Sequence, residues 1–129
     1  MIEVFIPVQK EFYLFKKECE NLYNSVQRQI TDTNDFEFVI NNTFFFLFTN
    51  NRKLIGAIYF FTDKNGRLFL NGFSKRKMHK LNIECLKMSL KWFKGSIYAE
   101  AQNRASALCL IRCGFKRIGN NLFRFNDCV

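Results

Sequence analysis

The stretch NRASALCLIRCGF, residues 103–115, specifies a helix together with both of its ends. Asn103 is a favoured N-cap residue, because its side chain can accept a hydrogen bond from an unpaired amide of the first turn. Arg112 lies where the helix dipole is negative, and Gly114 supplies the left-handed conformation on which many helices end. The pattern therefore predicts a helix over residues 104–113. The side chains expected to pack inward are those of Ala107, Leu108 and Ile111.

The segments around this helix continue an alternation of strands and helices. Residues 81–93 carry apolar side chains every three or four positions with lysines between them, which predicts a helix that Gly95 ends. Residues 96–101, SIYAEA, predict a strand. Residues 115–125 predict a closing hairpin around Gly119.

The N-terminal half predicts a strand, a long helix and an antiparallel meander. Residues 2–6 alternate in polarity, and residues 8–30 repeat apolar side chains at helical spacing. The segment FEFVI, residues 36–40, is rich in aromatic and branched residues, which favour strands. The turn Asn65-Gly66 is a strong hairpin signal. We expect three further aromatic-rich segments to pair as antiparallel strands: residues 43–50, 54–62 and 67–73.

In this order the elements predict one α/β domain over residues 1–129, a mixed sheet with helices on both of its faces. The succession of strand, helix and strand after a meander favours a parallel pair, because parallel neighbours need a crossover of helical length. The chain of 129 residues is 48% hydrophobic with 17 Phe, which is enough apolar area for a core. No Ser/Gly-rich linker suggests a second domain.

Positive charge is concentrated in the second half of the chain. Residues 1–65 hold 7 Lys/Arg against 8 Asp/Glu, whereas residues 66–129 hold 13 against 3. Such asymmetry indicates an anionic partner, for example nucleic acid, a phosphate-bearing cofactor or an acidic protein. A solvated surface that maintains solubility explains it equally well.

The cysteines and the N-terminus point to a reducing compartment. Five cysteines form an odd set without a CxxC pair, and the first residues lack the features of a signal peptide. No segment has the 18 or more uncharged apolar residues that a membrane span needs, so we expect a soluble protein. The cysteines are Cys19, Cys85, Cys109, Cys113 and Cys128.

The opening stretch also carries a family motif. Its spacing resembles the last conserved motif of the GNAT acetyltransferase superfamily, Asn-x-x-Ala/Ser-x-x-Phe/Leu-Tyr-x-Lys-x-Gly-Phe. The matching positions are Asn103, Ser106, Arg112, Gly114 and Phe115. The resemblance implies a GNAT-like fold, with which the order of elements agrees, and acetyl-CoA as the cofactor of the active members.

Departures from this family pattern bear on catalysis. GNAT enzymes hold the acetyl-CoA pyrophosphate on a Gln/Arg-x-x-Gly-x-Gly/Ala turn, where glycines let backbone amides approach the phosphates. Here residues 74–84 read SKRKMHKLNIE, and we expect the side chains of Leu81 and Ile83 to occupy that space. Leu110 stands where active relatives have a tyrosine that protonates the leaving thiolate. Glu100 is the remaining candidate for a general base, and we expect it to face solvent.

Residues 67–93 and 98–115 resemble more closely the degenerate GNAT-like proteins of short-tailed bacteriophages, which are internal virion or head-assembly proteins. That resemblance implies a protein with no catalytic residues and no cofactor, located in the virion and the host cytoplasm. Its expected partners are other virion proteins or nucleic acid. The residues of the degenerate loop and the helix start, where an anion would bind, are Lys75, Arg76, Lys77, His79, Lys80 and Asn103.

Two alternatives remain open at this stage. One is an active acetyl-CoA-dependent N-acetyltransferase, and the other is a nucleic-acid-binding module in which Phe69 and Phe73 stack on bases. Strand aromatics of this kind are more often part of a core.

Metal binding is not favoured by the sequence. His79 is the single histidine of the chain, and we expect it to be exposed. Cys109 and Cys113 share one helix face, but they would need two further ligands to hold a metal, so we expect them to be buried small hydrophobes.

Overall fold

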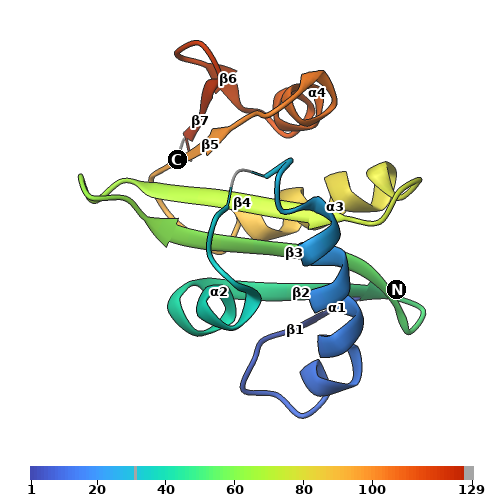
Figure 1. Ribbon diagram of the computed structural model, residues 1–129. Helices are drawn as coiled ribbons and strands as arrows, with labels where there is room; N and C mark the ends of the chain where they lie inside the picture. Colours follow the sequence, from blue (N-terminus) through green and yellow to red (C-terminus); the bar gives the residue numbers. More distant parts are fainter. Residues whose placement is uncertain (31, 127–129) are drawn as a thin grey trace.

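A seven-stranded mixed sheet forms the centre of the protein, seen in a computed structural model that describes residues 1–30 and 32–126 (Figure 1). Thr31 and residues 127–129, with Cys128, lie outside the described residues. Neighbouring strands pair antiparallel except β4 and β5, which are parallel. Across the sheet the strands are β1 (Ile2–Phe5), β2 (Phe44–Asn50), β3 (Lys53–Thr62), β4 (Leu68–Ser74), β5 (Ser96–Glu100), β7 (Leu122–Asn126) and β6 (Lys116–Arg117).

Two tight turns set the register of the β2–β3–β4 meander. Asn51 and Arg52 both have positive φ, as the two central residues of a type I′ hairpin turn require. At the next turn Gly66 has φ +78° and donates its amide to the Asp63 carbonyl at 3.0 Å. The hairpin predicted from Asn65-Gly66 is therefore confirmed.

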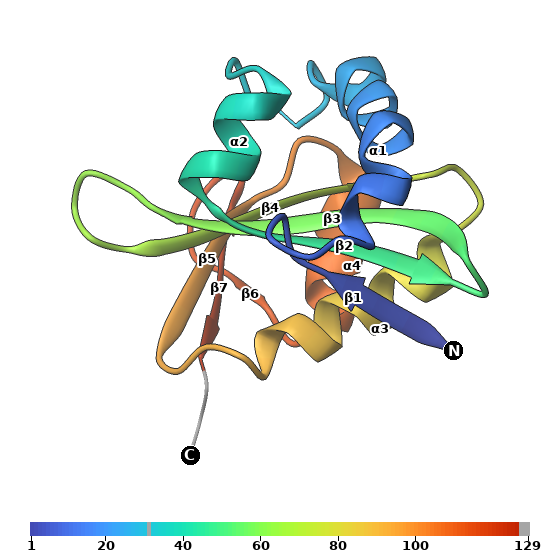
Figure 2. The ribbon, with the colours of Figure 1, turned by 90° about the horizontal axis from the view of Figure 1, so that it is seen from below.

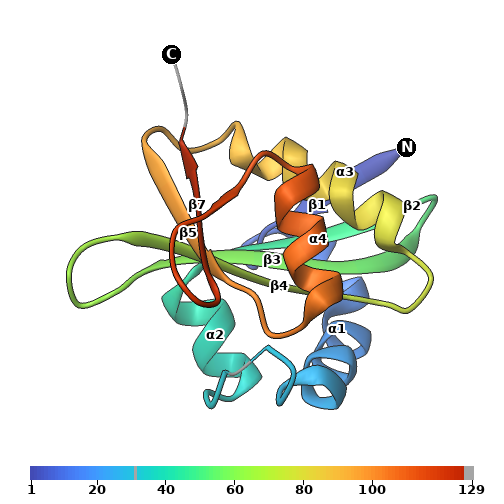
Figure 3. The same ribbon diagram turned by 90° about the horizontal axis from the view of Figure 1, so that it is seen from above.

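In the part of the chain that the structure describes, four helices cover the sheet, two on each face (Figures 2 and 3). On one face lie α1 (Phe12–Val26) and α2 (Phe36–Asn42), and on the other lie α3 (His79–Leu90) and α4 (Arg104–Arg112). The predicted α/β domain with helices on both faces is confirmed. No helix in the described part of the chain is long and apolar enough to cross a membrane.

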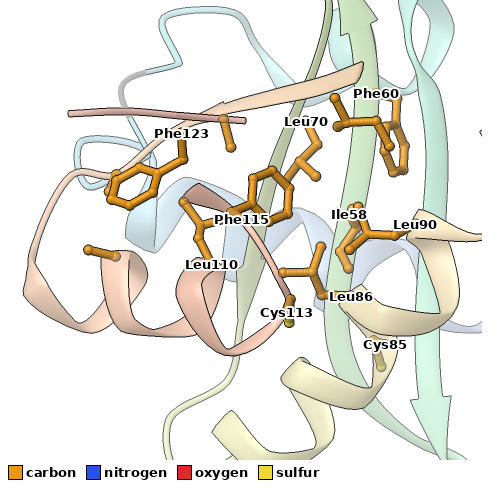
Figure 4. Close-up of a cluster of buried hydrophobic side chains, with 14 of the residues drawn as sticks. Ile58, Phe60, Leu70, Cys85, Leu86, Leu90, Leu110, Cys113, Phe115 and Phe123 are labelled. Atoms are coloured by element: carbon orange, nitrogen blue, oxygen red, sulfur yellow. The ribbon is translucent and has the colours of Figure 1, made fainter. Parts of the chain in front are cut away.

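Each face has its own hydrophobic core, and β3 belongs to both. Its Leu54, Ala57 and Tyr59 pack toward α1 and α2, while Ile58 and Phe60 pack toward α3 and α4. From Ala57 onward the alternation follows from the strand period, which points successive side chains to opposite faces. Leu54 lies three residues before Ala57 on the same face, because the pairing with β2 shifts register between them. On the α3/α4 side, Figure 4 shows side chains of both helices meeting over the strands.

The structure corrects the assignment of residues 36–40 as a strand-like segment. They lie in α2, where the Asp35 side chain accepts a hydrogen bond from the Phe38 amide at 2.8 Å. Phe36, Val39 and Ile40 are buried at helical spacing, so the cap and the packing of one helix face outweigh the β propensity of the aromatic residues. The first helix is also shorter than the predicted 8–30.

The inward face of α4 also differs from the prediction. Ala107 is buried as expected, but Leu108 is 43% exposed and Ile111 is 50% exposed. Leu110 and Cys113 are buried in their place. Positions 107, 110 and 113 lie on one side of the helix. Because apolar residues occur on two sides of this helix, the sequence alone did not determine which side faces the core.

The end signals of α4 are confirmed. Asn103 accepts a hydrogen bond from the Ser106 amide at 2.9 Å, and the Ser106 hydroxyl accepts one from the Asn103 amide at 3.2 Å. This reciprocal pair is a capping box. At the other end Gly114 has φ +98°.

Candidate functional site

The parallel strands β4 and β5 part shortly after they meet. Among the described residues their register comprises Leu68↔Ile97 and Phe69↔Tyr98. Leu70 and Asn71 of β4 and Glu100 of β5 lie past this short pairing. All three line two cavities, which lie toward different faces of the sheet and share these residues at the gap between the strands.

The larger cavity, about 570 Å³, lies toward α2 and the loop that precedes it. Three carboxylates line it, those of Asp32, Asp63 and Glu100, together with aromatic side chains. Asp63 forms an ion pair with Arg67 at 2.9 Å. Arg67 lines the cavity too, so three carboxylates against one guanidinium leave its lining net negative in a protein of net charge +9.

A buried phenol holds one of these carboxylates in place. The Tyr59 hydroxyl donates a hydrogen bond to Asp32 Oδ2 at 2.6 Å. Burial and the neighbouring carboxylate raise the pKa of Tyr59, so the phenol keeps its proton and remains a donor. Asn71 is fixed as well, because its Nδ2 donates to the Ile30 carbonyl at 3.0 Å.

The smaller cavity, about 110 Å³, lies between the strands and the helices α3 and α4. Asn82 contributes from α3, and Ser106, Cys109 and Leu110 contribute from α4. Leu110 is 5% exposed and offers no ionisable group. Cys109 is half-buried, and the Asn82 amide lies 3.9 Å from its sulfur.

The two α4 thiols interact. A hydrogen bond with Cys113 lowers the pKa of Cys109, and the same bond together with burial raises the pKa of Cys113. The Cys113 sulfur also lies 3.8 Å from the Ile83 carbonyl. Cys109 is thus the thiol that more readily becomes a thiolate.

Residues 75–80, here called the basic turn, lead from β4 into α3. Arg76, Lys77, His79 and Lys80 are exposed, and Lys77 has φ +65°, a left-handed conformation that favours glycine. No side chain within residues 1–30 and 32–126 caps the start of α3. The first-turn amides and the positive end of the helix dipole therefore face a cluster of cations, an arrangement suited to a phosphate anion.

Two other residues that were predicted to bind an anion already have protein partners. Lys75 is half-buried and forms an ion pair with Glu18 of α1. Asn103 is committed to the capping box of α4. Leu81 and Ile83, expected to fill the phosphate space, pack against the hydrophobic core on the α3/α4 side instead.

The structure also places His79, the strand aromatics and Glu100. His79 is exposed as predicted, and Phe69 and Phe73 are core residues with 8% and 5% exposure. Glu100 is exposed as expected, yet it lines both cavities. Across the described residues no group of three His, Cys, Asp or Glu side chains is placed to hold a metal ion.

Sequence reasoning missed several residues of the site. Asp32, Asn71 and Asn82 stand far apart in the chain and belong to no motif, so no signal identified them. Cys109 was noted for its spacing to Cys113 and interpreted as a buried hydrophobe, whereas it lines the small cavity.

The fold is that of the GNAT acetyltransferases. No known family profile and no curated protein sequence matches the chain. A GNAT acetyltransferase and an N-acetyltransferase, both from Staphylococcus aureus Mu50, superpose with TM-scores of 0.65 and 0.69 at 15% identity. The matches cover 98% of this chain and 99% and 97% of theirs.

An aminoglycoside acetyltransferase solved in complex with coenzyme A superposes equally well. Its TM-score is 0.69 at 9% identity, with 98% of this chain and 95% of that chain covered. At such identities these similarities establish the fold.

Proposed function

We propose that this protein is an acetyl-CoA-dependent N-acetyltransferase. The observation that carries the proposal is the gap between β4 and β5, where cavities from different faces of the sheet share Asn71 and Glu100 as lining residues. Such a gap lets a donor on one face reach an acceptor on the other. The solved structures that share the fold are described as acetyltransferases, which supports the same assignment.

The residues present fit coenzyme A by charge and by free donors. The uncapped start of α3 offers backbone amides, and Arg76, Lys77 and Lys80 surround it with positive charge, so a diphosphate would bind there. The small cavity next to α3 and α4 would take the acyl end. When bound, acetyl-CoA supplies an activated acetyl thioester.

Two carboxylates of the chain would bind the acceptor amine and take up its proton. The ammonium form of an amine must lose a proton before its nitrogen can attack a carbonyl carbon, and the Glu100 carboxylate lies at the gap, where it would accept that proton. Asp32, held by Tyr59, would attract the ammonium form of the acceptor into the large cavity. Leu110 cannot protonate a leaving thiolate.

A second candidate is the non-catalytic role that the bacteriophage resemblance implies. Leu110 at the tyrosine position and the glycine-free basic turn favour it. In that role the protein would bind other virion proteins or nucleic acid, in the virion and the host cytoplasm. Finding the chain in purified phage particles, together with no acetyl-CoA binding, would support this candidate.

Calorimetric titration with acetyl-CoA tests the binding site. Replacing Arg76, Lys77 and Lys80 together with Ala should weaken binding by about tenfold or more, a loss of about 1.4 kcal/mol. A matched control removes the same charge from the exposed lysines at the other end of α3 and just beyond it. In this control, Lys87, Lys91 and Lys94 are replaced with Ala. Equal losses in both triple variants would indicate nonspecific attraction and contradict the proposed site.

Turnover separates the two candidates. With a panel of primary amines as acceptors, the wild-type protein should release coenzyme A, and Glu100→Gln should slow this release by about 10²–10⁴-fold without weakening acetyl-CoA binding. Binding without turnover for every acceptor in the panel would favour the non-catalytic candidate.

A further inference from the structure

One thiol of the chain lies at the cavity where the acyl donor would react. Cys109 lines the small cavity together with Glu100, Asn82 and Ser106. The cavity of about 110 Å³ is several times the roughly 30 Å³ that one water occupies in the liquid, so an acetyl group fits beside the sulfur. Cys109 is the one α4 cysteine that is half-buried rather than buried.

Its surroundings favour the thiolate. The neighbouring Cys113 thiol, whose own proton points to the Ile83 carbonyl at 3.8 Å, lowers the pKa of Cys109, and the Arg112 charge lowers it further. The Asn82 amide points a further donor at the same sulfur from 3.9 Å. A thiol that lines a cavity, with a lowered pKa and an amide donor near its sulfur, is the arrangement found at nucleophilic cysteines.

Two fully buried cysteines, Cys85 and Cys19, lack these features. Burial raises the pKa of Cys85 to about 12, and Cys85 belongs to the hydrophobic core rather than to the lining of either cavity. Cys19 is fully buried on the other face of the sheet, and burial raises its pKa as well. Figure 4 shows Cys85 and Cys113 among the packed side chains of α3 and α4.

We propose that Cys109 is a catalytic nucleophile that takes the acyl group of a thioester donor onto its own sulfur before the group passes to the acceptor. This inference rests on the proposed function, because it takes acetyl-CoA as the donor. Acyl transfer through Cys109 would not need a tyrosine at position 110 to protonate the leaving thiolate.

The step balances as a thioester exchange. The Cys109 thiolate attacks the thioester carbonyl, a carbon–sulfur bond to Cys109 forms, and the bond to the coenzyme sulfur breaks. The coenzyme leaves as a thiolate and takes up the proton that Cys109 released. The acceptor amine then attacks the new thioester, its nitrogen passes one proton to the Glu100 carboxylate, the amide bond forms and the bond to the Cys109 sulfur breaks. Cys109 returns to its thiolate, with no change in oxidation state.

Intact mass spectrometry with peptide mapping tests the proposal on the full chain. Incubation with acetyl-CoA should add one acetyl group at Cys109, and hydroxylamine should remove it, because thioesters are labile to hydroxylamine and lysine amides are not. The label should be lost in Cys109→Ala and retained in Cys85→Ala, the matched control from the core. Cys113→Ala should slow labelling several-fold, because it removes the neighbouring thiol that lowers the pKa of Cys109.

A second donor separates failure of this proposal from failure of the proposed function. An acetyl thioester of N-acetylcysteamine has no diphosphate and does not depend on the basic turn. Calorimetric binding of acetyl-CoA without label on Cys109 from either donor would overturn the nucleophile and leave the acetyl-CoA site standing. Label from the short thioester without acetyl-CoA binding would support the nucleophile and contradict the proposed cofactor. Absence of label and of binding would overturn both.

Discussion

Replacing Gly56 with Ala should test the close approach of β3 and β4 that leads into the basic turn. Gly56 lies opposite Ser74, the last residue of β4. A Cβ atom at Gly56 would overlap the Phe73 carbonyl oxygen and lie 2.6 Å from the Ser74 Cα. Carbon atoms in contact normally lie about 3.5–4.0 Å apart, so the strands would have to separate by about 1 Å.

The cost follows from this overlap. Glycine in a strand is normally worse than alanine by about 0.5–1 kcal/mol, but here the clash is with backbone, which cannot rotate away. Overpacking costs typically 1–3 kcal/mol, and we expect about 3 kcal/mol for Gly56→Ala. A domain of this size loses about 4 °C in Tm per kcal/mol, so Tm should fall by about 12 °C.

Thermal unfolding followed by circular dichroism measures the effect. Gly72→Ala is the matched control on the same strand pair, because its Cβ would lie 3.1 Å from the Ala57 carbonyl oxygen and needs a small adjustment. We expect this control to change Tm by less than about 4 °C, equivalent to about 1 kcal/mol. A Tm for Gly56→Ala as close to wild type as that of Gly72→Ala would refute the reasoning.

Further predictions address the α4 cap, the Tyr59 hydrogen bond and the cysteines. Asn103→Ala removes the capping box and should cost about 1 kcal/mol, seen as a fall in Tm of about 4 °C; an unchanged Tm would contradict the role of the cap. Tyr59→Phe removes a hydrogen bond to the Asp32 carboxylate and should cost about 2 kcal/mol in urea unfolding, whereas a loss below about 0.5 kcal/mol would show that the bond contributes little. Iodoacetamide should modify Cys109 first, with a rate that reaches half its maximum below pH 9, because the pKa is lowered from 9.0 and the thiolate therefore persists to lower pH. The pKa of Cys85 is raised to about 12, so Cys85 should stay unmodified at pH 9 in the folded protein, and equal rates for the two thiols would contradict the assignment.

Much of the fold could be predicted because its signals are local. Asn65-Gly66 marked a hairpin, and the Asn103 cap and the Gly114 stop bounded α4, since each acts through neighbouring backbone atoms. The failures arose where tertiary packing decides. FEFVI has strand-like composition, yet the Asp35 cap and the burial of one helix face make it helical. In α4, Leu110 rather than Leu108 packs into the core.

The site was harder to predict because it is assembled from distant segments. The basic turn was visible as a run of charges, but the ion pair that occupies Lys75 depends on Glu18 of another helix. The gap between β4 and β5 arises from how far the two strands pair, which no residue pattern encodes. The proposed reactivity of Cys109 depends on its neighbour Cys113 and on a cavity that residues of β4, β5 and α3 also line.

The central claim is that the start of α3 beside the β4–β5 gap holds coenzyme A. A crystal structure of the wild-type protein with saturating coenzyme A tests this most directly. The account predicts density for the diphosphate within hydrogen-bond distance of the amides of residues 79–81, with the thiol end directed toward the small cavity. Coenzyme A bound elsewhere on the protein, or crystals with no coenzyme density, would contradict it.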